Sequence, residues 1–214
     1  MLIPEKLDAI IQILLSNEFG EKARLTVLDV ARQAGITAAM ARRLLLRLER
    51  SGYVGVRGTI RLLRAARLMD AWGYLYSIRE IERSEFVSAE RPQYVMPKIA
   101  NWARKEGVLY AFTLFSATEL VRPYVAPSTT SLYIHKKDLR RWQQFFREES
   151  ILPAEKEGNV VCLLAEKGHF QATTETRGAR IVSLPRLYAD LMSFGGRGEE
   201  AARELLQILR PNDV

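Results

Sequence analysis

Arginines gather in one short stretch of the chain, and their spacing suits contacts to an anionic partner. Ten arginines lie between Arg24 and Arg67, and four of these fall within residues 42–50. An arginine side chain can hold a phosphate, or the acceptor edge of a guanine, through two parallel hydrogen bonds. This chemistry predicts a nucleic-acid surface in the first third of the chain.

The elements expected to position these arginines form a helix-turn-helix. Apolar residues recur at helical spacing over residues 7–15, which predicts a first helix. A second helix is predicted to begin with Thr26 as its N-cap, and Asp29 completes a weak variant of the capping box. The second and third helices are joined across residues 34–36, where Gly35 allows a tight turn.

The third helix is predicted over residues 37–51, with Met40, Leu44 and Leu48 facing the core. Small residues near its start would let the helix enter the major groove of DNA. Contacts to base edges are assigned to Thr37, Ala38, Ala41 and Arg42. Contacts to phosphates are assigned to Arg43, Arg47, Arg57 and Arg61.

A short hairpin is predicted directly after this helix. Residues 53–62 are rich in β-branched side chains around an Arg57-Gly58 tip, as expected of two strands and a turn. A hairpin in this place is the wing of a winged helix, and its arginines could reach the DNA backbone. Winged helices also serve as protein-interaction modules, so an adaptor that binds no nucleic acid stays an alternative. The clustering of arginines on the helix fixed by the motif favours DNA.

Other residues with chemical potential give weaker patterns. His135 and His169 stand 34 residues apart without ligand-type spacing, so no metal site is expected. Cys162 lies in an apolar run, which favours a buried, inert thiol. Glu166 and Lys167 follow a predicted strand and hint at a magnesium-dependent nuclease, the second alternative. The preceding predicted strands carry no further carboxylate, which disfavours that activity.

A glycine-rich segment near the end of the chain is the last candidate. Gly195-Gly196-Arg197-Gly198 could cradle a phosphate at a helix start, but no Gly-Lys-Ser/Thr follows. Glu199 and Glu200 would repel an anion there, so a plain loop before a closing helix is the favoured interpretation. We therefore expect no enzyme activity and no cofactor.

Composition agrees with a DNA-binding protein. The 214 residues carry a net charge of +7 and are 48% hydrophobic. Residues 1–67 hold 12 Lys and Arg against 6 Asp and Glu, whereas residues 68–214 hold 20 against 19. The positive charge is therefore concentrated at the start of the chain, as expected for a polyanion partner. With no signal-peptide pattern and no long apolar run, we expect a soluble cytoplasmic protein without membrane association.

The expected fold class is α+β: an N-terminal winged helix-turn-helix followed by a small mixed α/β C-terminal domain. The winged helix covers residues 1–67, a helical connector and loop cover residues 68–95, and the α/β domain covers residues 96–214. A helix is expected over residues 64–82 and a loop or isolated strand over residues 84–97, which hold two prolines. Beyond them, strands are predicted at 108–112, 131–134, 159–165 and 169–174, the last pairing with the one before it. Helices are predicted at 99–106, 115–121 and 139–149, and two more follow residue 183.

Two blocks of the second half resemble a known family. Residues 110–124 read YAFTLFSATELVRPY, and residues 182–191 and 196–206 read VSLPRLYADL and GRGEEAARELL. Together they resemble the AbiEi-type antitoxins, the transcription-regulating members of type IV toxin-antitoxin systems. The chain departs from the family pattern at Leu114, where glycine is frequent, and at Thr118, where a second alanine is frequent. Pro185-Arg186 likewise replaces a more usual polar pair.

The resemblance implies a repressor that binds its own operator DNA. It also implies a genetic partner, a nucleotidyltransferase toxin that is encoded alongside and not contacted directly. Because one winged helix reads one half-site, a homodimer or paired binding on an inverted repeat is expected.

Overall fold

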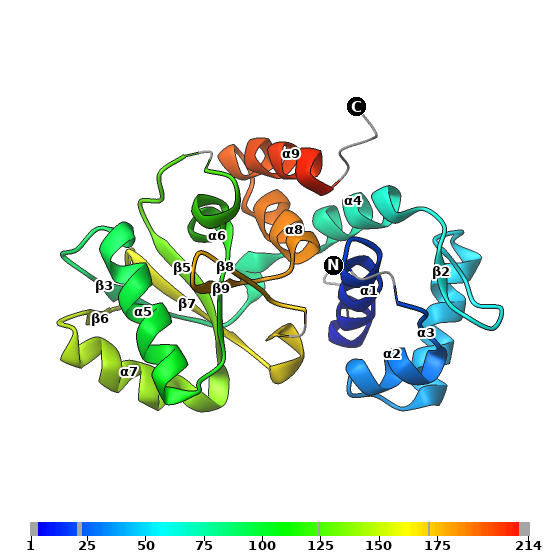
Figure 1. Ribbon diagram of the computed structural model, residues 1–214, viewed down its shortest axis with the longest axis horizontal. Helices are drawn as coiled ribbons and strands as arrows, with labels where there is room; N and C mark the ends of the chain where they lie inside the picture. Colours follow the sequence, from blue (N-terminus) through cyan, green and yellow to red (C-terminus); the bar gives the residue numbers. More distant parts are fainter. Residues whose placement is uncertain (1–3, 21–22, 124, 171, 210–214) are drawn as a thin grey trace. The chain divides into compact units, whose positions relative to one another are not determined.

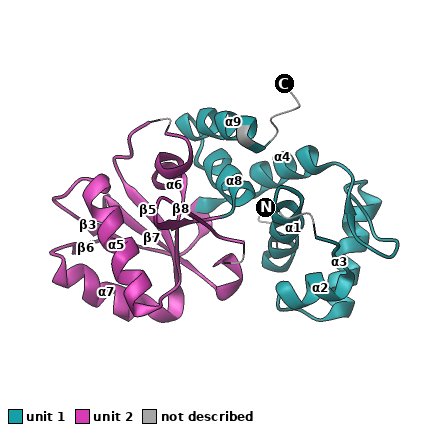
Figure 2. Cartoon of the chain, viewed as in Figure 1, with its two compact units in different colours: residues 1–78, 183–214 teal, residues 79–182 magenta. Residues whose placement is uncertain are grey.

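The computed structural model describes residues 4–20, 23–123, 125–170 and 172–209 (Figure 1). The chain divides into two compact units (Figure 2). Unit 1 comprises residues 1–78 and 183–214, and unit 2 comprises residues 79–182. A winged helix followed by a mixed α/β region confirms the predicted fold class. The compact units do not follow the expected division of the chain, because residues 183–214 group with the N-terminal part.

The helix-turn-helix forms as predicted at the start of unit 1. Thr26 caps its second helix: its side chain accepts a hydrogen bond from the Asp29 amide, and the Asp29 carboxylate accepts one from the Thr26 amide at 3.0 Å. Gly35 turns the chain with a φ of +63°, in the region where glycine is favoured. The three helices are α1 (Glu5–Glu18), α2 (Val27–Gln33) and α3 (Ala38–Arg50).

The wing follows α3 as an antiparallel pair of short strands, β1 (Val54–Gly55) and β2 (Arg61–Leu62). The Ile60 amide donates a 2.8 Å hydrogen bond to the carbonyl of Leu25, which joins the hairpin to the segment before α2. The Val56 amide donates to Oε1 of Glu49 at 2.9 Å, so a side chain of α3 also holds the wing.

Three further helices are described in unit 1: one follows the wing, and two lie near the end of the chain. α4 packs against α1 and α8, and α8 packs against α9. A Cβ at Gly73 of α4 would lie only 3.1 Å from Cβ of Met192, so glycine is what allows α4 and α8 to approach so closely. The helices are α4 (Ala65–Leu75), α8 (Leu184–Phe194) and α9 (Arg197–Leu209).

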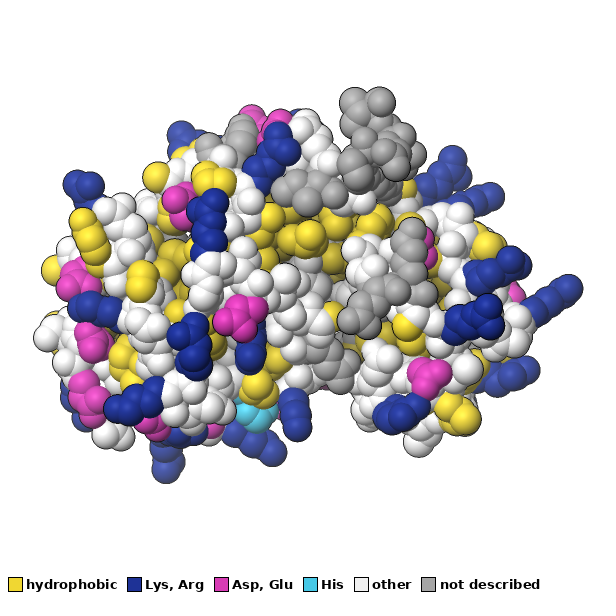
Figure 3. Space-filling view, in the orientation of Figure 1, with side chains coloured by type: hydrophobic (Ala, Val, Ile, Leu, Met, Phe, Trp, Pro, Cys, Tyr) yellow, Lys and Arg dark blue, Asp and Glu magenta, His cyan; other side chains and the backbone are white. Residues whose placement is uncertain are grey.

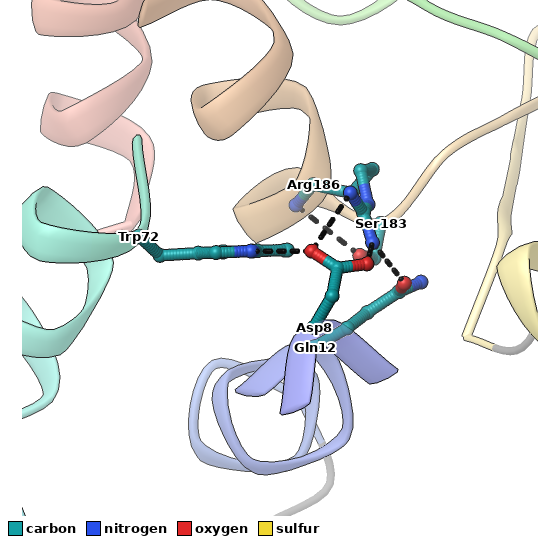
Figure 4. A network of polar contacts seen from close by, with 5 residues as sticks. All are labelled: Asp8, Gln12, Trp72, Ser183 and Arg186. Carbon is teal, nitrogen blue, oxygen red and sulfur yellow. Dashed lines mark hydrogen bonds and ion pairs between the residues drawn. The ribbon is translucent and has the colours of Figure 1, made fainter. Parts of the chain in front are cut away.

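A buried ion pair joins α1, α4 and α8 (Figure 4). Arg186, which is 0% exposed, places Nη2 at 2.5 Å from Oδ2 of Asp8 and at 2.8 Å from Oε1 of Gln12. Trp72 donates its indole N–H to Oδ1 of Asp8 at 2.7 Å, and the guanidinium lies over the Trp72 and Tyr76 rings. Because a buried charge is tolerated only with good partners, this pair fixes how the three helices meet.

Unit 2 is built on a seven-stranded mixed sheet with the order β6-β3-β7-β5-β4-β9-β8. β5 runs parallel to β7 and β4 runs parallel to β9, whereas the other neighbours are antiparallel. The strands are β3 (Arg83–Val87), β4 (Tyr110–Phe112), β5 (Thr130–His135), β6 (Leu152–Ala154), β7 (Val160–Ala165), β8 (Thr174–Thr176) and β9 (Ala179–Ile181).

An aromatic core joins the sheet of unit 2 to two of its helices. Trp102 of α5 stacks on Phe145 of α7 with ring centroids 4.4 Å apart, and Trp142 and Phe146 of α7 are fully buried beside them. The helices are α5 (Pro92–Glu106), α6 (Leu114–Val121) and α7 (Leu139–Glu148). Short 3-10 turns are η1 (Ile78–Glu80), η2 (Lys136–Asp138) and η3 (Lys167–Phe170).

Three expectations for this half of the chain were wrong. The helix expected over 64–82 ends at Leu75. A strand is present at the start of residues 84–97, but β3 pairs with two neighbours and is not isolated. The first turns of α5 follow where a loop was expected, because Pro92 occupies the first helical position, where no N–H is needed. None of the described residues within 169–174 pairs with β7: His169 and Phe170 lie in a 3-10 turn, and the strand that begins at Thr174 pairs with β9 instead.

The backbone at Leu114 explains why glycine is frequent at this position in the family that the sequence resembles. It follows β4 with a φ of +50°, the left-handed region in which glycine is usual. The frequent glycine of the family at this position therefore matches a turn that requires positive φ. Here a leucine adopts the conformation, and its side chain is buried.

Candidate nucleic-acid interface

α3 presents one face to the core of unit 1 and the opposite face to solvent. Ala41 and Leu45 are 0% exposed, and Leu48 is buried with them. The exposed residues of the helix are Ala38, Ala39, Arg42, Arg43, Arg47 and Arg50. The assignment of Ala41 to a base edge is therefore wrong, because its side chain lies inside the protein.

Ala41 was assigned to the exposed face because the sequence does not fix the rotation of α3 about its axis. Residues 44–46 are three consecutive leucines, so apolar stripes beginning at Met40 or at Ala41 fit the sequence equally well. In the structure Met40 and Leu44 are only partly buried. Ala41 is fully buried, and α3 packs against α1, α2 and β1.

The first turn of α3 carries the small residues that a recognition helix needs. Thr37 is the N-cap: its hydroxyl accepts a 3.3 Å hydrogen bond from the Met40 amide and keeps its own O–H to donate. Ala38 and Ala39 are exposed beside it. Ala39 lies on the same stripe as Arg43 and Arg50, at the centre of the exposed face, and was missed by the sequence reasoning.

The wing adds two exposed arginines to this surface. Arg57 lies at the tip of the hairpin before Gly58, whose φ is +76°, and Arg61 lies on β2. Lys and Arg side chains project from the end of unit 1 that carries α3 and β2 (Figure 3). Because Glu49 binds the wing amide, the hairpin arginines have a fixed place relative to α3.

The arginines of this surface have no carboxylate partners among the residues described. No ion pair is formed there by Arg42, Arg43, Arg47, Arg50, Arg57 or Arg61. By contrast, Arg32 of α2 lies 2.5 Å from Asp29. Clustered, unneutralised charges of one sign produce a positive potential that attracts polyanions.

The other candidate residues have ordinary structural surroundings. Cys162 is fully buried, and burial raises the pKa of its thiol well above the usual range. His135 Nδ1 lies 3.5 Å from Asp138, and the His169 ring lies against Tyr133. Across the described parts of the chain, no three His, Cys, Asp or Glu side chains are grouped so that they could hold a metal ion.

The two remaining motifs also have local explanations. Glu166 forms an ion pair with Lys136, and the hydrogen bond from Lys136 lowers the pKa of the Glu166 carboxyl. The glycine-rich segment turns through Gly195 and Gly196, which both have positive φ, and leads into α9. Of the helices described, none combines the length and the apolar character needed to cross a bilayer.

Comparison with known families agrees with this geometry. A family model described as "IclR helix-turn-helix domain" matches residues 17–58, which contain α2, α3 and the start of the wing. A second, described as "Transcriptional regulator, AbiEi antitoxin, Type IV TA system", matches residues 61–210. No curated protein and no solved structure matches the chain. With more than two thirds of its length matched, the chain belongs to the AbiEi antitoxin family of transcriptional regulators and carries a DNA-binding helix-turn-helix domain.

Proposed function

We propose that this protein represses its own transcription as the antitoxin of a type IV toxin-antitoxin system. The observation that carries the proposal is the row of exposed arginines on α3 and the wing, which has no carboxylate partners in the described residues. A positively charged surface centred on a recognition helix fits the phosphate backbone of double-stranded DNA. Binding at its own upstream DNA would then block transcription.

In this proposal α3 enters the major groove. Thr37, Ala38, Ala39 and Arg42 face the base edges, with Ala39 replacing the buried Ala41. Phosphates are contacted by Arg43, Arg47, Arg57 and Arg61. Residues near the start of a recognition helix usually read bases, whereas arginines farther along it and on the wing reach the backbone.

The proposal names two further partners, a second copy of the protein and a toxin. One winged helix reads one half-site, so we propose that two copies bind an inverted repeat. Since the matched family model describes an antitoxin of a type IV system, we also propose a toxin as the genetic partner, namely the nucleotidyltransferase encoded alongside that the sequence resemblance implies. The proposal requires no cofactor and no catalytic residue.

The test is a gel shift with the purified full-length protein. A duplex from upstream of its own gene is compared with random DNA of equal length, at two salt concentrations. We expect tighter binding to the upstream duplex, weakening as salt rises because phosphate contacts release counterions. Equal binding to both duplexes would contradict a specific operator. Binding to neither, together with salt-insensitive capture of a protein, would favour the adaptor instead.

Two variants separate base reading from backbone contact. Arg42→Ala should reduce the preference for the upstream duplex, with a cost of about 1–3 kcal/mol if Arg42 reads a guanine. Arg57→Ala should weaken binding to both duplexes similarly and lower the slope against salt by about one unit. If neither change alters binding, the surface has been assigned to the wrong partner.

A further inference from the structure

The basic surface of α3 and the wing continues onto the first turn of α4. Arg64 is the N-cap residue of α4, and Arg67 lies three positions later, so the two share one side of the helix. Both side chains are exposed and form no ion pair with a described carboxylate. The two arginines line a shallow pocket together with Glu18, which forms no ion pair with either of them.

Contacts at the end of α3 place Arg64 beside the proposed DNA surface. A Cβ at Gly52, which follows α3, would lie 3.6 Å from Nη1 of Arg64. The Leu63 amide donates a 2.8 Å hydrogen bond to the carbonyl of Tyr53, just beyond Gly52. The start of α4 is thus joined to the end of α3 that carries Arg47 and Arg50.

The arginines at the end of α3 and the start of α4 repel one another, and the nearby backbone carbonyls offset only part of this repulsion. The C-terminal carbonyls of α3 attract a nearby cation, which accounts for the position of Arg64. They do not account for Arg67, which lies one turn farther along α4. Arginines gathered without ion-pair partners repel one another, and a polyanion removes that repulsion.

The other side of α4 is fixed in the core of unit 1. Leu68 and Met69 are buried, and Trp72 donates to Asp8 of α1 at 2.7 Å. Tyr188 of α8 donates its hydroxyl proton to Oδ1 of Asp70 at 2.7 Å. The backbone that carries the arginines therefore needs no rearrangement to bind a rigid ligand, which lowers the entropic cost of binding.

We propose that Arg64 and Arg67 form a third contact to the DNA backbone, in addition to those of α3 and the wing. The inference rests on the proposed DNA-binding function and extends the proposed surface from α3 and the wing onto α4. Because phosphates carry no sequence information, these arginines strengthen binding to all duplexes equally. They widen the segment of DNA that one protein molecule covers.

The test compares Arg64→Ala and Arg67→Ala with a matched control, Arg203→Ala. Arg203 is an exposed arginine of α9 in the same unit, 3.8 Å from Glu199. Each test variant should weaken binding to the upstream and the random duplex by roughly tenfold, as the loss of one charge-assisted hydrogen bond predicts. Each should also lower the salt slope by about 0.9. Arg203→Ala should change affinity less than about twofold, and Arg67→Lys should keep most of the binding.

Hydroxyl-radical footprinting gives a second measurement. The double variant Arg64→Ala/Arg67→Ala should lose protection at one end of the protected segment and keep the protection in its centre. If both variants bind like the wild type while Arg47→Ala binds weakly, the third contact is refuted and the proposed function stands. A lower melting temperature with an unchanged salt slope would likewise refute it, since that result fits a purely structural role. If the wild-type protein binds neither duplex, the proposed function fails first and the third contact fails with it.

Discussion

Basic side chains in the two units have different neighbours. In unit 2, Lys98 lies 2.9 Å from Glu90 and 3.0 Å from Glu149, and Arg141 lies 3.0 Å from Glu106. In unit 1, the exposed arginines of α3 and the wing have no such carboxylates among the described residues. The comparison teaches that position matters as well as pairing: these unpaired arginines of unit 1 are gathered on one helix and the hairpin that follows it.

Unit 1 also contains an arginine that is buried and paired rather than exposed and unpaired. Arg186 is fully buried and fully enclosed by Asp8, Gln12 and two aromatic rings. Exposed ion pairs contribute only about 0–1 kcal/mol to stability, whereas breaking a buried pair costs far more. Unit 1 thus contains a buried arginine that holds helices together and exposed arginines to which the proposed function assigns DNA binding, and substitutions can separate these two roles.

The largest effect is expected from Arg186→Ala. The change leaves the Asp8 carboxylate buried without its cation, which should lower the free energy of unfolding by about 3–5 kcal/mol. Urea denaturation measures this loss. Arg203→Ala is the control and should cost less than about 1 kcal/mol, because its pair with Glu199 is exposed. An equally small loss for Arg186→Ala would show that the pair does not hold unit 1 together.

The next effect separates the two faces of α3. Ala41→Leu adds volume to a fully buried site and should destabilise the protein by about 1–3 kcal/mol. Ala39→Leu enlarges an exposed residue, so stability should be unchanged while DNA binding weakens. Thermal melting measures the stability of both variants, and gel shifts measure their DNA binding. The reverse pattern would mean that the faces of α3 are assigned the wrong way round.

A third experiment compares exposed arginines across the units. Arg47→Ala in α3 should lower DNA affinity about tenfold, or about 1.4 kcal/mol. Arg104→Ala in unit 2 should leave it unchanged, because that side chain lies 3.8 Å from Glu175 and binds the Gly178 carbonyl. Fluorescence anisotropy with a labelled duplex measures both. Equal losses would show that total charge, rather than its position, governs binding.

The smallest effect concerns an exposed pair of unit 2. Lys136 lowers the pKa of Glu166, so the ionised carboxylate stabilises the folded state above its ordinary pKa of 4.5. That contribution is lost as the pH falls through the lowered pKa of the folded state. In Lys136→Ala the pKa of Glu166 should rise toward its ordinary value, which NMR titration of the carboxyl can follow. An unchanged pKa would mean that Lys136 is not its main partner.

Much of the fold could be predicted because its signals are local. Capping at Thr26, the turn at Gly35 and the apolar stripe of α1 each act within a few residues. The start of α5 was missed because Pro92 and Pro97 indicated a loop, and β3 was expected at most as an isolated strand. The return of residues 183–214 to unit 1 could not be predicted, since it depends on the pairing of residues 178 positions apart.

The elements that carry the candidate site could be predicted from the sequence, but the exposed face of α3 could not. The helix and hairpin that carry the arginines are where the sequence indicated. The face of α3 was not fixed, because three consecutive leucines allow two helical phases and tertiary packing against α1, α2 and β1 selects one. Glu49, which holds the wing, gave no signal, because a glutamate in a helix usually faces water.

The long separation between Asp8 and Arg186 has a consequence for how the protein is made. Chains emerge from the ribosome N-terminus first, so the winged helix appears long before the arginine that neutralises its buried carboxylate. A product cut short within unit 2 would retain α3 and the wing but lack α8 and α9. The buried ion pair of unit 1 therefore cannot form until synthesis has reached Arg186, 178 residues after Asp8.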